Sequence, residues 1–241
     1  MSGRYVTLNT EIQKISILIN ENPDRYRAED EESVKNMLSG ILDFAITAHE
    51  GQKRKGTKIP YIVHPIETAI ILAQNNASNE AICAGILHDV LEDTVGDENE
   101  ICERLDRVGL SSERVLQIVY GTSEPSKLLA KQGDVEEESW KERKVHTIKY
   151  LESLGNDELS VDIKLVACAD KLSNIRAMVN DYEQYKKEGK DGSELFERFN
   201  APSSDQQWYY EALVIALKDL VELPMYREFA DLVLKLFTKL S

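Results

Sequence analysis

The sequence has few of the residues that build turns and cross-links. Its 241 residues include only 12 glycines and 6 prolines, too few for a turn-rich β-sandwich, a collagen-like repeat or a long low-complexity linker. Cysteine is equally scarce, since Cys83, Cys102 and Cys168 are the only ones and form no C-x-x-C pair. This pattern favours reduced, buried thiols over a disulfide framework.

Long apolar runs and positive charge are also missing. No apolar stretch reaches the length of about 18 residues that a membrane span requires. The N-terminal segment has no apolar signal-peptide core, so we expect a cytoplasmic protein with no membrane partner. Acidic residues outnumber basic ones by 43 to 29, for a net charge of -14. This balance argues against nucleic acid as a partner, because such proteins neutralise phosphates with lysine and arginine.

What the sequence has in quantity is helical periodicity. Apolar residues recur at steps of three and four over residues 34–46, 209–220 and 229–240, which is typical of amphipathic helices. Pro224 separates the last two stripes, so residues 205–240 are predicted to form a helical hairpin. Shorter helices are predicted over residues 8–20, 64–75, 97–107, 111–120 and 140–154. Segments 80–92 and 160–178 are apolar on nearly every side, as in buried central helices.

The predicted fold is therefore an all-α helical bundle with at most a small hairpin near residues 51–62. That segment, GQKRKGTKIPYI, is basic and reads as a loop or hairpin between two helices. The chain has no internal repeat and no linker-like change of composition. Residues 1–241 are therefore predicted to form one domain, with its core over residues 35–220.

Charged residues are most informative where they interrupt apolar segments. His88, Asp89, Glu92 and Asp93 end the apolar run that begins at residue 81, and Asp170 follows a run of apolar and small residues. Burying an ionised carboxylate without a partner costs several kcal/mol, so such groups are normally paired or bound to a metal. One divalent cation would account for both cases.

The spacing of the first four residues suggests two separate roles. Adjacent His88 and Asp89 can reach one ion from the side of a helix. Glu92 and Asp93, one turn further on, can orient or deprotonate a water bound to that ion. The alternative is a polar pair at a helix end, satisfied by ordinary hydrogen bonds.

Two further ligands are candidates. His64 lies at a loop-to-helix junction where the following proline fixes the backbone, and Asp170 is the fourth. Two imidazoles and two carboxylates leave open positions on an octahedral ion, which suits manganese or iron better than a closed tetrahedral zinc site.

Three stretches of the chain resemble a known family. The resemblance rests on AHEGQKRKGTKIPYIVHPIETA, GILHDVLEDT and KLVACADKLSNIRAM. They are similar to the HD-superfamily hydrolase domain of the Rel/SpoT proteins, and the short chain resembles the stand-alone small alarmone hydrolases. The resemblance covers roughly residues 35–220. It implies an HD-domain helical bundle that hydrolyses the 3′-diphosphate of guanosine tetra- or pentaphosphate, (p)ppGpp, to GDP or GTP and pyrophosphate.

The resemblance also implies roles for individual residues. One manganese ion, with Fe2+ or Co2+ as possible substitutes, would be held by His64, His88, Asp89 and Asp170. Glu92 and Asp93 would handle the attacking water. The residues lining the nucleotide would be Arg54, Lys55, Asn174 and Tyr209. Tyr209 also belongs to the apolar stripe of its helix, so a place in the core is an equal alternative.

The sequence is compatible with these implied contacts. Arg54 and Lys55 precede His64 by ten and nine residues, close enough to bring positive charge to a phosphate beside the ion. Asn174 follows Asp170 by four residues and would face the same cavity. The chain has only 4 histidines, which disfavours the two-metal HD phosphodiesterases.

Other candidates are weaker. His49 is expected to support the site or cap its helix, and His146 is expected at the surface. Residues 121–140 form an acidic stretch that is longer than in compact relatives. Lys141 and Lys144 after it are candidate phosphate contacts, with a solvated helix face as the alternative.

Several functions remain open on the sequence. The same metal site would suit an NADPH 3′-phosphatase or a (p)ppApp hydrolase. Outside catalysis, the chain could serve as an alarmone-binding regulatory module or as an antitoxin that acts by contact. The expected partner is a small nucleotide, and the sequence leaves the oligomeric state open.

Overall fold

The computed structural model describes residues 31–133 and 136–239 of the chain. The helix predicted over residues 8–20 lies outside these ranges. The helices of the described part are α2 (Glu31–Ala48), α3 (Val63–Gln74), α4 (Asn79–Leu87), α5 (Val90–Asp93), α6 (Glu98–Arg107), α7 (Ser112–Thr122), α8 (Pro125–Gln132), α9 (Trp140–Ser153), α10 (Glu158–Lys187), the 3-10 turn η1 (Gly192–Arg198), α11 (Ser203–Ala216), η2 (Lys218–Leu220) and α12 (Pro224–Thr238). Within these ranges the β pairing consists of one antiparallel bridge, between Lys53 and Pro60. The prediction of an all-α bundle with a small hairpin is confirmed.

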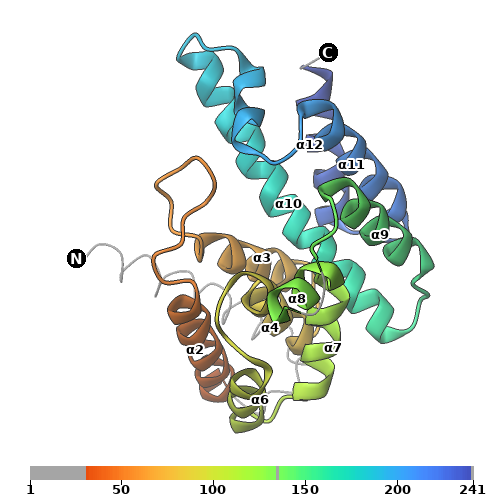
Figure 1. The fold of residues 1–241 in the computed structure, drawn as a ribbon. Coiled ribbons are helices and arrows are strands. Elements are labelled where there is room, and N and C mark those ends of the chain that lie inside the picture. Colours follow the sequence, from red (N-terminus) through yellow and green to blue (C-terminus); the bar gives the residue numbers. More distant parts are fainter. Residues whose placement is uncertain (1–30, 134–135, 240–241) are drawn as a thin grey trace.

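The long helix α10 organises the bundle. Figure 1 shows α10 running through the molecule, with α3, α4 and α7 packed along one part of it and α12 along another. Helix α11 packs on both α9 and α12, while α2 and α6 close the end of the bundle beside α4 and α7. The helices α3, α4 and α10, which carry or adjoin the four candidate ligands, therefore all contact one another.

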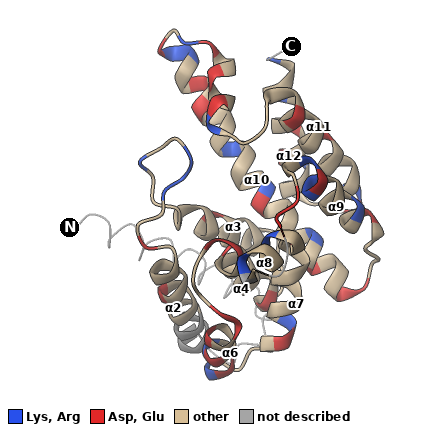
Figure 2. Ribbon diagram, viewed as in Figure 1, with Lys and Arg blue, Asp and Glu red and all other residues tan. Residues whose placement is uncertain are grey.

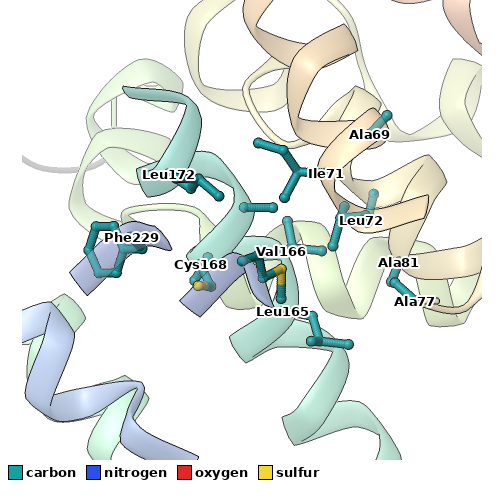
Figure 3. Packing of buried hydrophobic residues seen from close by; sticks show 14 of the residues in the cluster. Ala69, Ile71, Leu72, Ala77, Ala81, Leu165, Val166, Cys168, Leu172 and Phe229 are labelled. Carbon is teal, nitrogen blue, oxygen red and sulfur yellow. The ribbon is translucent and has the colours of Figure 1, made fainter. Parts of the chain in front are cut away.

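The two segments predicted to be central are buried. Residues 81–87 of α4 and 162–170 of α10 are all buried. Figure 3 shows Leu72 of α3, Val166 of α10 and Phe229 of α12 among the side chains that meet between these helices. Cys83 and Cys168 are free and buried, as predicted, and Cys102 is free and half-buried.

Gly85 lets α3 and α4 pack closely. A Cβ atom at Gly85 would lie 2.5 Å from the Cδ1 atom of Leu72, which is itself completely buried. The close approach fixes the first turn of α3, which carries His64, relative to the C-terminal end of α4, which carries His88.

Side chains at the predicted boundaries stop and start the helices. Ser78 accepts a hydrogen bond from Ala81 N at the start of α4, and Asp157 accepts one from Ser160 N at the start of α10, both in the manner of N-caps. Pro224 was predicted to separate two helices. It does so as the first residue of α12, where its missing N–H costs nothing.

Three details of the sequence prediction are wrong. The helix predicted through residue 92 ends at Leu87 and resumes at Val90. The imidazole of His88 donates to Gly85 O at 2.9 Å, the carbonyl that a continuing helix would use for the amide of Asp89. Helix α8 and the turn η1 are not predicted from the sequence, and the described side chains of α8 form no buried apolar stripe that would indicate a helix.

No helix among the described residues is long and apolar enough to cross a membrane.

Candidate active site

Four ionisable side chains from three parts of the chain converge at one end of a cavity of about 760 Å³. His64 comes from the first turn of α3, His88 and Asp89 from the break between α4 and α5, and Asp170 from the middle of α10. One ligand atom each of His64, His88 and Asp89 lies within 4.8 Å of the others. Asp170 Oδ1 lies 3.1 Å from His64 Nε2 and 3.8 Å from His88 Nε2. The structure thus brings together all four residues predicted as ligands.

Hydrogen bonds fix which nitrogen of each imidazole faces the cluster. His88 donates through Nδ1 to Gly85 O. His64 Nδ1 lies 2.8 Å from Ser173 Oγ, and that hydroxyl donates to Glu67 Oε2 at 2.9 Å, so the hydroxyl oxygen accepts from His64. Nε2 of each imidazole therefore faces the cluster and presents a lone pair there when the ring is neutral, as in imidazoles that bind metals.

These lone pairs face carboxylate oxygens. His88 Nε2 is buried and has no hydrogen-bond partner among the described residues, although it lies 3.0 Å from Asp89 Oδ2. His64 Nε2 lies 3.1 Å from Asp170 Oδ1. Two electron-rich atoms at this separation repel each other unless a cation or a proton lies between them. The donor set therefore fits a divalent cation.

The charges of the cluster support the same interpretation. Burial disfavours the charged form of His88, but Asp89 and Asp170 outweigh burial and raise the pKa of His88 to about 9. Burial also opposes ionisation of Asp89, and the neighbouring histidines overcome it and lower the pKa of that carboxyl. For Asp170, Lys171 and the histidines overcome burial and hold its pKa well below the usual range. Both carboxylates are ionised at neutral pH and attract positive charge to the cluster.

Neighbouring groups hold the two carboxylates in place. Tyr61 donates to Asp89 Oδ2 at 2.5 Å. Asp170 receives Lys171 Nζ on Oδ2 at 2.5 Å and Asn174 Nδ2 on Oδ1 at 2.6 Å. Arg54 in turn donates to Asn174 Oδ1 at 2.7 Å, so a chain of contacts leads from the cluster to the basic hairpin.

The acidic pair Glu92 and Asp93 lies on α5 and lines the same cavity. Lys127 of α8 contacts both, at 2.8 Å from Glu92 Oε2 and 3.1 Å from Asp93 Oδ1. Glu92 Oε1 accepts from the backbone N–H of Glu124. Burial raises the pKa of Glu92, with Lys127 opposing the rise.

Basic and aromatic side chains form another wall of the cavity. Glu124 is held by Arg143 Nε at 2.5 Å and by Lys144 Nζ. Lys144 Nζ also lies 4.9 Å from the centre of the Tyr209 ring, and that ring packs edge-on against Trp140 at 5.8 Å. Tyr209 borders the cavity but is only 3% exposed, so it belongs to both the core and the wall.

The remaining predicted residues have distinct positions. Lys55 is exposed and lines the cavity. His49 is buried behind Tyr61, with ring centres 4.9 Å apart, and contacts Gln52 through Nδ1 at 2.8 Å, as expected of a supporting residue. His146 is exposed beside Glu138.

Lys141 and Lys144 differ in position although they are three residues apart. Lys144 lines the cavity. Lys141 pairs with Asp205 and lies 3.4 Å over the Trp208 ring, outside the residues that line the cavity. Of the two candidate phosphate contacts, only Lys144 is placed to meet a ligand there.

Sequence reasoning missed several side chains of the site. Each of these side chains contacts a partner 28 to 109 positions away along the chain, so no local sequence pattern indicates its role. They are Tyr61, Glu67, Lys127 and Ser173. Arg143 was passed over although it adjoins Lys144. The sequence signal for Arg143 is its place directly before Lys144.

Residues 41–202 match the HD domain family. This chain belongs to the HD domain family. HD domains are metal-dependent hydrolases, and the histidine and aspartate cluster is a candidate metal site of that kind.

Individual proteins are similar to this chain in sequence over more than half of its length. A putative GTP diphosphokinase RSH1 of Oryza sativa subsp. japonica is 34% identical over 62% of this chain and 16% of the relative. A guanosine-3′,5′-bis(diphosphate) 3′-pyrophosphohydrolase of Aquifex aeolicus is 33% identical over 66% of this chain and 20% of the relative. The chain thus spans a fifth or less of the length of these relatives.

Solved structures share the fold. A crystal structure of a Listeria monocytogenes EGD-e protein matches with a TM-score of 0.56 and 26% identity over 77% of this chain and 99% of the other. A metazoan orthologue of SpoT, described as hydrolysing ppGpp, matches with a TM-score of 0.56 and 19% identity over 83% of this chain and 94% of the other.

Proposed function

We propose that this chain is a manganese-dependent pyrophosphohydrolase that removes the 3′-diphosphate of guanosine tetra- or pentaphosphate. The observation that carries the proposal is that Nε2 of both buried imidazoles faces the carboxylates of Asp89 and Asp170, beside an acidic pair in one cavity. The name of the Aquifex aeolicus relative supports the choice of substrate.

His64, His88, Asp89 and Asp170 are the residues that would hold the ion. Two nitrogen and two oxygen ligands leave positions open for water and substrate, a set that suits Mn2+. When bound, the cation would act as a Lewis acid that lowers the pKa of a coordinated water molecule and polarises a phosphoryl oxygen.

In the proposed reaction, water attacks the phosphorus that is attached to the ribose 3′-oxygen. The bond between that phosphorus and the 3′-oxygen breaks, the 3′-oxygen takes a proton, and pyrophosphate leaves. Glu92, whose pKa is raised by burial, accepts the proton of the water. Asp93, on the same turn of α5, orients that water.

Basic side chains of the cavity meet the phosphates. Arg54 and Lys55 come from the hairpin, and Arg143 and Lys144 from α9. A guanidinium binds phosphate oxygens in pairs, and an ammonium acts as a point charge. Asn174, already bonded to Arg54, positions the ribose end of the nucleotide between the cluster and the hairpin.

The direct test is product analysis with purified protein and Mn2+. Guanosine tetraphosphate should yield GDP and pyrophosphate, and NADPH and the adenosine analogue, offered under the same conditions, should react more slowly. Release of phosphate from NADPH in preference would replace this proposal with a 3′-phosphatase. Metal binding without turnover on any substrate would favour a binding module.

Substitution of Glu92 tests the assigned chemistry. Glu92→Gln should retain Mn2+ and lower turnover by about 10²- to 10⁴-fold, the usual contribution of a positioned acid or base. Glu113→Gln is the matched control, because Glu113 is exposed on α7 and lies outside the cavity lining. Equal turnover of the two variants would assign the proton transfer to another group.

A further inference from the structure

The catalytic carboxylate and the cationic wall of the cavity are both occupied by one short segment of this chain. Glu124, just before α8, places its carboxylate between Arg143 and Lys144, while its backbone N–H and Lys127 take the two oxygens of Glu92. We refer to Glu124 and Lys127 together as the 124–127 latch. Figure 2 shows Lys or Arg (blue) at α8 and Asp or Glu (red) along the connection from α8 to α9.

The latch occupies atoms of Glu92, Arg143 and Lys144 that a ligand would otherwise contact. The Glu92 side chain is 8% exposed, and each of its oxygens already accepts a hydrogen bond, so the latch competes with water for this carboxylate. The side chains of Arg143 and Lys144 are 10% and 15% exposed and hold Glu124. Arg143 also contacts Glu137 through a second nitrogen, at 2.6 Å. A phosphate that takes the positions on Arg143 Nε and Lys144 Nζ has to replace the carboxylate of Glu124.

Helix α8 is built to be displaced. None of the side chains described for α8 is fully buried, and Leu128 packs partly buried against the core, so limited apolar burial holds α8 in place. Its polar anchors are the Lys127 contacts and the bonds from Lys131 to the carbonyls of Leu91 and Thr94. Extended backbone at Ser123 and Glu124 precedes α8, and Gly133 with φ 84° ends it.

We propose that the 124–127 latch is an autoinhibitory contact, which a phosphate of the substrate opens by displacing Glu124 from Arg143 and Lys144. Because Glu124 N and Lys127 belong to the same segment, the displacement also uncovers Glu92. Binding of the anion and exposure of the catalytic carboxylate are thereby one event. The identity of the anion as a nucleotide diphosphate rests on the proposed function, whereas the exchange of carboxylate for phosphate does not.

The exchange is favourable because a phosphate group brings more charge than a carboxylate. The two cations already overcome burial and lower the pKa of Glu124, so they bind a dianion more strongly still. The closed latch withholds Glu92 from water until such an anion is present, and this limits the reaction to ligands with a phosphate in that position.

The first test measures affinity for inorganic pyrophosphate by titration calorimetry on the full chain. Glu124→Gln removes the competing charge, so pyrophosphate should bind at least about fivefold more tightly than to the unmodified protein, within the usual range of coupling between sites. Lys144→Met should weaken binding. Glu138→Gln is the matched control, because it removes the same charge from a neighbouring residue whose side chain contacts His146 rather than the cations.

The second test follows the unmodified protein by hydrogen exchange. Pyrophosphate should speed exchange of the α8 amides, residues 128–133, even as it slows exchange elsewhere in the cavity wall. The latch is refuted if Glu124→Gln binds pyrophosphate no more tightly than Glu138→Gln, if Lys144→Met leaves binding unchanged, or if α8 exchanges at the same rate or more slowly with pyrophosphate.

These measurements separate the latch from the proposed activity. Neither requires turnover, so a protein that fails to hydrolyse guanosine tetraphosphate can still support or refute the latch. Conversely, hydrolysis of guanosine tetraphosphate with unchanged affinity in Glu124→Gln would keep the activity and remove the latch.

Discussion

Ser173 gives the sharpest test of how the candidate metal site is oriented. Its hydroxyl accepts from His64 Nδ1 and donates to Glu67, and this relay turns the lone pair of His64 toward Asp170. Ser173→Ala removes the relay without altering any residue proposed as a ligand. We therefore expect the fold to persist and the affinity for Mn2+ to fall.

The magnitude follows from burial. His64 is 3% exposed and Ser173 is 1% exposed, so water can reach the position of the lost hydroxyl only from the cavity that both residues line. A buried donor left without a partner costs about 1–3 kcal/mol of stability. Loss of the group that orients a metal-binding histidine typically lowers metal affinity by about 10- to 100-fold. The substitution leaves the side-chain volume almost unchanged, so a cavity contributes little.

Calorimetric titration with Mn2+ and urea denaturation measure the two effects separately. Ser160→Ala is the matched control, since it makes the same change near the start of α10, where the hydroxyl bonds only to the exposed cap Asp157. Ser160→Ala should leave Mn2+ affinity unchanged. An affinity for Mn2+ in Ser173→Ala within twofold of the Ser160→Ala value would show that the relay does not orient His64.

Two further predictions concern packing and protons. Gly85→Ala should destabilise the protein by about 1–3 kcal/mol through overpacking against Leu72. Gly40→Ala, with no atom within 4 Å of its added Cβ, should stabilise α2 by up to about 1 kcal/mol; urea denaturation of both variants compares them. Folding raises the pKa of His88 from 6.5 to about 9, because the protonated imidazole is stabilised by the neighbouring carboxylates. This contribution to the stability of the metal-free protein is complete below pH 6.5 and is lost as the pH rises through 9. Mn2+ binding near pH 7.5 should therefore release about one proton, measurable by calorimetry in buffers of different ionisation enthalpy, and this release should disappear above pH 10.

The parts of the fold that followed from sequence are those governed by local periodicity. The apolar stripe at 34–46 and the shorter helix predicted over 64–75 match α2 and α3 to within a few residues, because the buried residues of an amphipathic helix recur in its sequence at the helical period. The break at His88 did not follow, because it depends on a side chain competing with the backbone for Gly85 O. Helix α8 was missed because its side chains are held by ion pairs rather than by an apolar stripe.

The same distinction applies to the site. The adjacent His88 and Asp89 and the isolated Asp170 were visible because charge within an apolar run is costly and conspicuous. The orienting partners were not visible, since Ser173 is an ordinary helix residue until the fold brings it 2.8 Å from His64. Whether the four clustered residues bind metal is a prediction that the Mn2+ titrations above test.

The charge balance explains how an acidic chain can accept a polyanion. The net charge of the chain is -14, yet the cavity is lined by as many lysine and arginine side chains as aspartate and glutamate. The excess negative charge therefore lies outside the cavity, where it repels nucleic acid and other extended polyanions. Inside, the basic groups are already paired with acidic ones, as Lys127 is with Glu92 and Lys144 with Glu124. A compact phosphate gains entry because it can exchange with one such carboxylate, while a cation between Asp89 and Asp170 would turn the local balance positive. Selectivity for a small phosphorylated ligand thus follows from where the charges pair rather than from the overall charge.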